Sequence, residues 1–96
     1  MKVKAYLEIT MQIADENRSA AANVFFKYKE EFLKNIQGAI TKDLLIRKED
    51  IQVIHGFDSV ANAENYLLSD LFKNDVYIEL KALWQTDPEV KIYTVA

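Results

Sequence analysis

The chain contains no cysteine, a single proline, two glycines and one histidine among its 96 residues. Without cysteine it can form no disulfide, present no thiol nucleophile and build no thiolate zinc site. Scarce glycine and proline and a 50% content of hydrophobic residues indicate a chain that folds rather than one that stays disordered. The length suits one small domain covering residues 1–96.

The sequence also lacks an excess of basic residues and a long apolar run. Its formal net charge of -3 argues against binding to the phosphate backbone of nucleic acid, which requires a basic face. No segment approaches the roughly 18 to 20 consecutive apolar residues of a membrane span. The first residues show a strand pattern rather than a signal peptide. We therefore expect a cytoplasmic protein with no nucleic-acid or membrane partner.

Residues 3–13, "VKAYLEITMQI", alternate between apolar and polar side chains, which predicts a half-buried strand. The spacing of the apolar residues then changes. After the turn at "ADEN", with Asn17 as the expected N-cap, apolar residues recur every three or four positions and predict a helix that ends near Gly38. This helical stripe consists of Ala21, Val24, Phe25, Tyr28, Phe32 and Ile36.

The second half of the chain opens with two short runs, "AITKDLLIR" and "IQVIHGFD", joined by the polar link "KED". They predict an antiparallel hairpin. Ser59 is a candidate N-cap for a short helix that breaks at Ser69, and a second helical stretch follows through Gln85. Pro88 ends the helical pattern, and "VKIYTVA" alternates as a last strand.

The predicted order is βαββαβ with the second helix split. This order gives a ferredoxin-like α+β fold, a four-stranded antiparallel sheet with the helices on one face. The opposite face would carry an apolar and aromatic set, and such a face is more often an interface than a solvated surface. We therefore expect a homodimer through the sheet face that bears Tyr6, Thr10, Tyr93, Val95 and either Leu44 or Leu45.

The element order and the segments "VIHGFDSVANAENYLLSDLF" and "VKIYTVA" resemble the dimeric α+β barrel superfamily, and within it the antibiotic biosynthesis monooxygenase (ABM)-like group. The resemblance covers nearly the whole chain. It implies the ferredoxin-like fold and a dimer. Members of this superfamily include cofactor-free monooxygenases of aromatic polyketides, haem-degrading enzymes and small-molecule isomerases, so the fold alone does not choose the activity.

One branch of this resemblance can be tested on particular residues. The segment "LLSDLFKND" is similar to the haem-degrading members, which carry an iron-binding histidine a few residues later and a tryptophan where this chain has Phe57. Here Val76 and Tyr77 occupy the place of that histidine. Because the axial ligand is the main lever of a protein on haem iron, we expect no haem and no other cofactor. Ligation by Tyr77 is the alternative.

His55 lies on the strand face of Ile51, Val53 and Phe57, which we expect to look toward the helices. The resemblance places a substrate cleft there. It makes His55 the candidate catalytic residue, as a general base or an oxyanion donor. The candidate substrate-binding residues are Phe57, Phe25, Tyr28, Tyr77 and Trp84. A buried core histidine is the alternative for His55. One imidazole with no nearby carboxylate predicts no metal site.

Two functions follow. The first is a cofactor-independent monooxygenase, or a related small-molecule enzyme, with an aromatic or polyketide-like substrate in a hydrophobic cleft. The second is a non-catalytic, ligand-binding or stress-associated dimer of the same fold. The size of the cleft separates the two functions. A pocket of roughly 300 Å³ or more beside His55 favours the enzyme, and a filled cleft favours the alternative.

Overall fold

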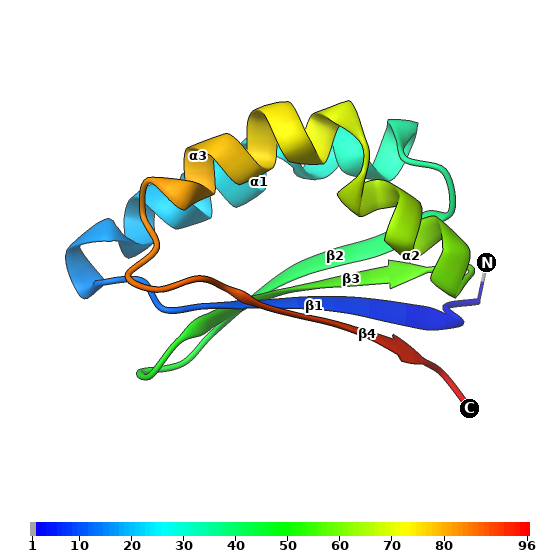
Figure 1. The fold of residues 1–96 in the computed structure, drawn as a ribbon, viewed down its shortest axis with the longest axis horizontal. Coiled ribbons are helices and arrows are strands. Elements are labelled where there is room, and N and C mark those ends of the chain that lie inside the picture. Colours follow the sequence, from blue (N-terminus) through cyan, green and yellow to red (C-terminus); the bar gives the residue numbers. More distant parts are fainter. Residues whose placement is uncertain (1) are drawn as a thin grey trace.

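A computed structural model describes residues 2–96 and shows helices packed on one face of a four-stranded sheet (Figure 1). The strands are β1 (Ala5–Met11), β2 (Ala39–Ile46), β3 (Ile51–Phe57) and β4 (Glu89–Thr94). The helices are η1 (Asp15–Asn17, 3₁₀), α1 (Arg18–Asn35), α2 (Val60–Leu67), η2 (Leu71–Val76, π) and α3 (Tyr77–Lys81). The predicted ferredoxin-like α+β architecture is confirmed, including the split second helical segment.

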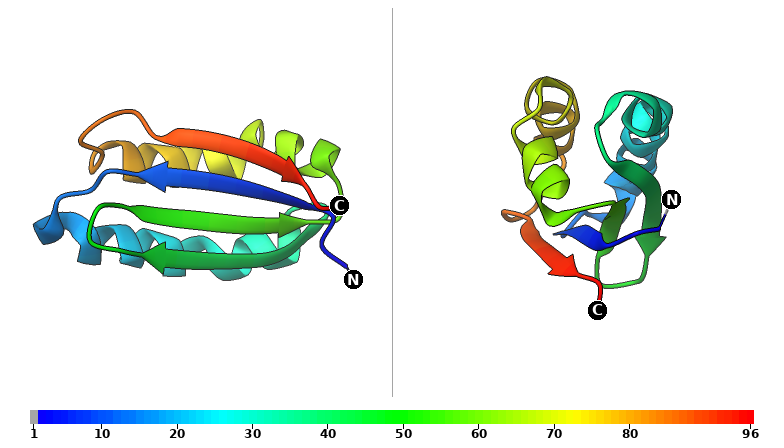
Figure 2. Two further views of the ribbon diagram at one scale, coloured as in Figure 1. Left: turned by 90° about the horizontal axis from the view of Figure 1, so that it is seen from below. Right: turned by 90° about the vertical axis from the view of Figure 1, so that its right-hand side faces the viewer.

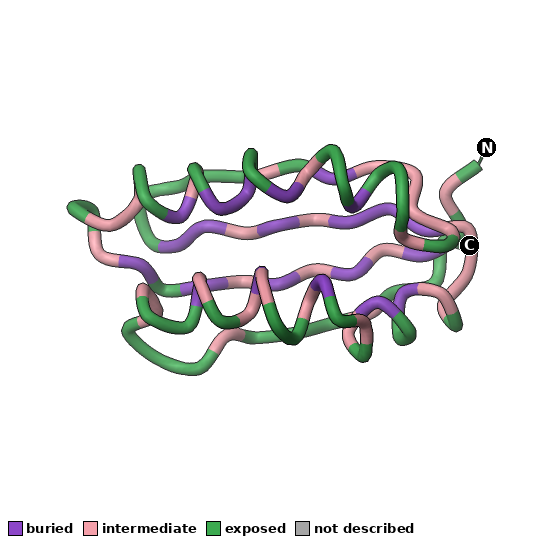
Figure 3. The backbone as a smooth tube through the Cα atoms, turned by 90° about the horizontal axis from the view of Figure 1, so that it is seen from above, coloured by how far each residue is buried: buried purple, intermediate pink, exposed green. Residues whose placement is uncertain are grey.

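The strands pair antiparallel in the order β2-β3-β1-β4, with β1 and β3 at the centre (Figure 2). Leu7 of β1 lies opposite both His55 of β3 and Ile92 of β4. Buried residues alternate along the two central strands (Figure 3), because every second side chain points toward the helices. This register fixes which strand residues line the space between sheet and helices.

The core fills that space. The predicted stripe of α1 is buried from Ala21 to Phe32 and packs over the sheet. At one end of the core, Phe32 forms edge-to-face contacts with Phe57 and Tyr66, at ring-centre distances of 5.6 and 4.9 Å. Aromatic pairs in this geometry add to the free energy gained by burial alone. The same cluster surrounds the only histidine, as described below.

The break at Ser69 has a clear physical cause. Its hydroxyl donates to the carbonyl oxygen of Tyr66 at 2.6 Å and accepts from the backbone N–H of Phe72 at 3.2 Å. The hydroxyl thus closes one helix and caps the next, as an N-cap serine does. Ser59 also caps as predicted, because its Oγ accepts from the N–H of Asn62 at 3.1 Å.

Two predicted element ends were wrong. The first strand ends at Met11, and the last helix ends at Lys81 rather than Gln85. The reason is a backbone contact between these ends: Ile13 forms an isolated bridge with Trp84. Asn17 precedes α1 but makes no side-chain cap, since the chain already turns in η1. No helix within residues 2–96 is long and apolar enough to cross a membrane.

The far face of the sheet is mixed rather than uniformly apolar. Tyr6 pairs in register with Tyr93, which is 47% exposed. Toward the other end of the face, Gln52 donates to the hydroxyl of Thr10 at 3.0 Å. The register also decides between the two leucines. Leu45 pairs with Gln52 on this face, and its neighbour in β2 points toward the helices.

Candidate functional site

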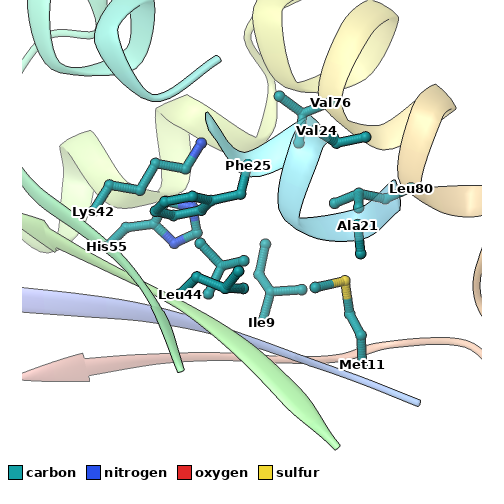
Figure 4. A pocket seen from close by; sticks show the side chains of 11 residues that line it. Ile9, Met11, Ala21, Val24, Phe25, Lys42, Leu44, His55, Val76 and Leu80 are labelled. Carbon is teal, nitrogen blue, oxygen red and sulfur yellow. The ribbon is translucent and has the colours of Figure 1, made fainter. Parts of the chain in front are cut away.

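Two polar side chains project from neighbouring strands into the space under the helices. Lys42 of β2 and His55 of β3 are cross-strand partners and are 3% and 2% exposed. Figure 4 shows both side chains extending toward Phe25 of α1. They line a cavity of about 20 Å³, here called the inner cavity, whose other walls are mainly apolar and include Ile9, Phe25, Leu44, Val76 and Leu80.

His55 is held as a neutral imidazole. Its Nδ1 lies 3.0 Å from the carbonyl oxygen of Leu7. Because a carbonyl only accepts, Nδ1 carries the proton and Nε2 is left as an acceptor. Burial lowers the pKa of His55 to about 3, and the charge of Lys42 acts in the same direction. At neutral pH this histidine is therefore a weak base that can accept a hydrogen bond.

The ring of His55 is packed among aromatic side chains. It lies 5.3 Å from Phe32, 5.4 Å from Tyr66 and 6.5 Å from Phe57, measured between ring centres. These contacts, with the hydrogen bond to Leu7, are those of a satisfied core residue. The structure thus combines both readings of His55: it belongs to the core and also lines the inner cavity.

Lys42 is the more unusual of the two residues. Within residues 2–96 its ammonium group has no hydrogen-bond acceptor or carboxylate partner, and it lies over the rings of Phe32 and Phe25, at 4.9 and 5.6 Å. Burial and, to a smaller extent, the positive charge of Lys29 lower its pKa to about 8. A lysine is rarely buried without a partner, and such groups gather at functional sites.

A second, larger space opens beside the inner cavity. This hollow has a volume of about 310 Å³ and lies between the α2-η2-α3 segment and β4. Three aromatic side chains form its wall: Tyr77 lies 6.0 Å from Phe72 and 5.3 Å from Trp84, both edge to face. Its lining consists of Ile9, Leu67, Phe72, Tyr77, Leu80, Trp84, Pro88 and Val90. This set is called the aromatic hollow below.

One of the residues that line the aromatic hollow carries an unpaired polar group. The indole N–H of Trp84 is buried and has no hydrogen-bond partner within the described residues. A buried donor without a partner costs free energy. The hollow and the inner cavity are separated by two side chains that line both, Ile9 and Leu80.

The predicted site residues do not share one site. Phe25 lines the inner cavity with His55, and Tyr77 and Trp84 line the aromatic hollow. Phe57 is fully buried and stacks on His55, outside both spaces.

Tyr28 points elsewhere. Its hydroxyl donates to the Glu79 carboxylate, which also pairs with Lys27 at 3.2 Å. The hydrogen bond to Glu79 raises the pKa of Tyr28, and the bond from Tyr28 lowers the pKa of Glu79. This network ties α1 to α3 and lines neither space.

Sequence reasoning missed Lys42 and Phe72. A signal for Lys42 was present in the sequence, because alternation in "AITKDLLIR" places it on the same strand face as Leu44. Phe72 falls in the second helical stretch, where an apolar residue at helical spacing indicates core rather than a binding site. No group of three or more histidine, aspartate or glutamate side chains within residues 2–96 is arranged to hold a metal ion.

No protein-family model matches the sequence, and no curated protein matches it. Solved structures do match. A conserved protein from Methanosarcina mazei Go1 is 18% identical, with a TM-score of 0.84 over 98% of this chain and 94% of that one. A protein from Caulobacter crescentus CB15, assigned as an antibiotic biosynthesis monooxygenase, is 13% identical, with a TM-score of 0.83 over 99% and 92% of the two chains.

A third match is a monooxygenase from the gene ActVA-Orf6 of Streptomyces coelicolor, solved in complex with the ligand nanaomycin D. It is 10% identical, with a TM-score of 0.82 over 98% of this chain and 88% of that one. At such identities the matches establish the fold, and function must be argued from the site. The chain adopts the α+β fold of the ABM-like proteins, as the resemblance in its sequence implies.

Proposed function

We propose that the protein is a cofactor-independent monooxygenase that binds an aromatic, polyketide-like small molecule in the aromatic hollow. The observation that carries this proposal is the volume of about 310 Å³, which has the rings of Phe72, Tyr77 and Trp84 along its wall. This volume lies at the lower end of the range typical of small-molecule sites, and aromatic walls with few polar groups are characteristic of them.

The hollow favours a planar, uncharged and apolar ring system. Its lining includes no acidic or basic side chain, so charged ligands would lose hydration without compensation. Edge-to-face packing against Tyr77 and Phe72 would hold the ring plane.

The chemistry that suits such a site is oxidation of a methylene group activated by flanking aromatic rings. For the overall reaction R₂CH₂ + O₂ → R₂C=O + H₂O, the substrate supplies all electrons and no external reductant is required. The methylene proton passes to solvent as the substrate binds, because no basic side chain lines the hollow, and the hollow then excludes water and orients the ring. The S. coelicolor neighbour, a monooxygenase solved with an organic ligand, supports this assignment.

Dithranol, a dihydroxyanthrone with such a methylene group, is the probe for the first experiment. Trp84 is the only tryptophan, so binding in the hollow should quench its fluorescence directly. We expect saturable quenching and oxygen consumption faster than the uncatalysed autoxidation of dithranol. Tyr77→Ala should weaken binding by about tenfold or more, since it removes a ring from the wall.

The matched control for Tyr77→Ala is Ile78→Ala, because Ile78 is the next residue of α3 and is 56% exposed. It should bind dithranol as the unmodified protein does. Equal losses in both variants, or no quenching in the unmodified protein, would refute binding in the aromatic hollow.

A non-catalytic ligand-binding protein is the second candidate function. Its support is the inner cavity of about 20 Å³, which leaves His55 with no room for an organic substrate. His55 is also a weak base, because burial lowers its pKa to about 3. Saturable quenching of Trp84 by dithranol without any acceleration of oxygen uptake would select this function.

We also propose that the protein works as a cytoplasmic homodimer joined through the far face of the sheet. The paired Tyr6 and Tyr93, with the 38% exposed Val95, form the apolar end of this face. Burying these side chains against a second copy would remove them from water. A test of this assembly is given in the Discussion.

A further inference from the structure

We propose that the inner cavity is a binding site for dioxygen and that the Lys42 ammonium stabilises the superoxide formed there. The inference rests on the proposed monooxygenase function and assigns a place to its second substrate. It identifies Lys42, rather than His55, as the side chain that promotes the reaction with oxygen.

The size and lining of the cavity suit a small apolar gas. A volume of about 20 Å³ exceeds the 10 to 15 Å³ that one water molecule requires and is far too small for an aromatic ligand. Apolar side chains such as Ile9, Leu44 and Val76 make up most of the wall. The polar side chains of the wall are those of Lys42 and His55, and the rest of the wall suits a guest that needs no hydrogen bond.

One positively charged residue lines this apolar space. Lys42 is 3% exposed and has no carboxylate partner within residues 2–96, and the rings of Phe32 and Phe25 provide its only close attraction. No acidic side chain lines the cavity. A neutral oxygen molecule gains little from this cation, but an anion formed from it gains strongly in a low-dielectric site.

The position of the cavity beside the aromatic hollow supports the same reaction. Ile9 and Leu80 line both spaces, so a ring in the hollow would lie one side chain away from a gas molecule in the cavity. The π-helix η2 contributes Val76 to the cavity wall and Phe72 to the hollow. Single π-helical turns occur frequently at functional sites.

The redox step balances without a cofactor. The substrate carbanion gives one electron to dioxygen, R₂CH⁻ + O₂ → R₂CH• + O₂•⁻, and the Lys42 ammonium stabilises the superoxide. The superoxide passes between Ile9 and Leu80 into the hollow and combines with the substrate radical to R₂CH–OO⁻, which takes back from solvent the proton released there earlier. The resulting hydroperoxide loses water to give R₂C=O. Both oxygen atoms and all electrons are thereby accounted for.

Dissolved oxygen is paramagnetic and speeds the nuclear relaxation of groups near it. Its binding can therefore be measured by NMR on the ligand-free protein. We expect pressurised oxygen, compared with pressurised argon, to enhance methyl relaxation more at Leu44 and Val76 than at Ile51. Ile51 is 1% exposed but lines neither space, and serves as the reference. Val53→Ile adds one carbon at the cavity wall and should abolish the extra relaxation at Leu44 and Val76.

The role of Lys42 is tested by steady-state kinetics with dithranol and varied oxygen. Lys42→Met should lower kcat/KM for oxygen by about tenfold or more, with KM for dithranol changed by less than about twofold. Lys48→Met, at an exposed lysine of the β2-β3 turn, is the matched control and should behave as the unmodified protein.

Equal relaxation at Leu44, Val76 and Ile51 would overturn the gas site, whether or not dithranol is oxidised. An unchanged kcat/KM for oxygen in Lys42→Met would overturn the assigned role of the ammonium. Selective relaxation without dithranol oxidation would leave the gas site in place and refute the proposed function instead.

Discussion

Lys42 and His55 stand opposite each other across β2 and β3, and both side chains are almost completely buried. They cannot both be charged, because two neighbouring cations in a low-dielectric space repel each other. The pKa of about 8 for Lys42 and about 3 for His55 place the single charge on the lysine at neutral pH.

Replacing Lys42 should stabilise the fold. Its pKa is 10.5 in the unfolded chain and about 8 in the folded protein. The folded state is thus penalised below pH 8, and the penalty disappears as the pH rises to 10.5. We expect Lys42→Met to raise the free energy of unfolding at pH 7 by about 1 to 3 kcal/mol, measured by urea denaturation.

The gain from Lys42→Met should shrink toward zero near pH 10.5, whereas the exposed control Lys48→Met should change the urea midpoint little at any pH. A destabilised Lys42→Met protein at pH 7 would show that the ammonium makes a stabilising contact absent from the structure.

His55 should remain neutral until the protein unfolds. Its folded pKa of about 3 lies below the unfolded value of 6.5, so stability is complete above pH 6.5 and is lost as the pH falls toward 3. By pH 5 this residue alone should cost about 2 kcal/mol. Because it is the only histidine, its imidazole NMR signals need no assignment by mutation. A titration midpoint near 6.5 in the folded protein would contradict the buried position.

The proposed dimer depends on the apolar end of the far sheet face. Sedimentation equilibrium at micromolar concentration should give the mass of two chains, and Tyr93→Glu should give one. The control is Phe26→Glu, which places the same charge at a 66% exposed aromatic residue of α1 on the opposite side of the protein. A monomer in the unmodified protein would rule out this assembly.

The double hydrogen bond of Ser69 should be measurable as a cap. Ser69→Ala removes the acceptor for the N–H of Phe72 and the donor to Tyr66, and should cost about 1 kcal/mol of stability. Ser19→Ala, at an exposed position of α1, should be nearly neutral in the same urea titration. Equal midpoints for both variants would show that the cap contributes nothing.

Much of the fold could be predicted because its signals are local. The alternation in β1 and β3 and the stripe of α1 determine which faces are buried, and Ser59 and Ser69 mark helix starts. The boundaries that failed depend on a contact between distant segments. Pairing of Ile13 with Trp84 ends both elements, and no local pattern in either segment encodes this pairing.

The site was harder to predict for a related reason. Phe25, Tyr77 and Trp84 were expected around one cleft between sheet and helices, but periodicity cannot divide them between two spaces. Lys42 was overlooked because a lysine in a short strand is ordinarily solvated, and its burial depends on α1 packing above it. Whether an imidazole has free space beside it is likewise set by packing.

The π-helical turn η2 also bears on how the length of this chain can vary. A π-helical turn holds one residue more than an α-helical turn, so deleting one residue between Leu71 and Val76 can restore ordinary helical winding with little rotation of the residues that follow. Leu80 would then keep its place between the two spaces. Related chains that keep both spaces should therefore include some that are one residue shorter here, with an α-helical turn in place of η2.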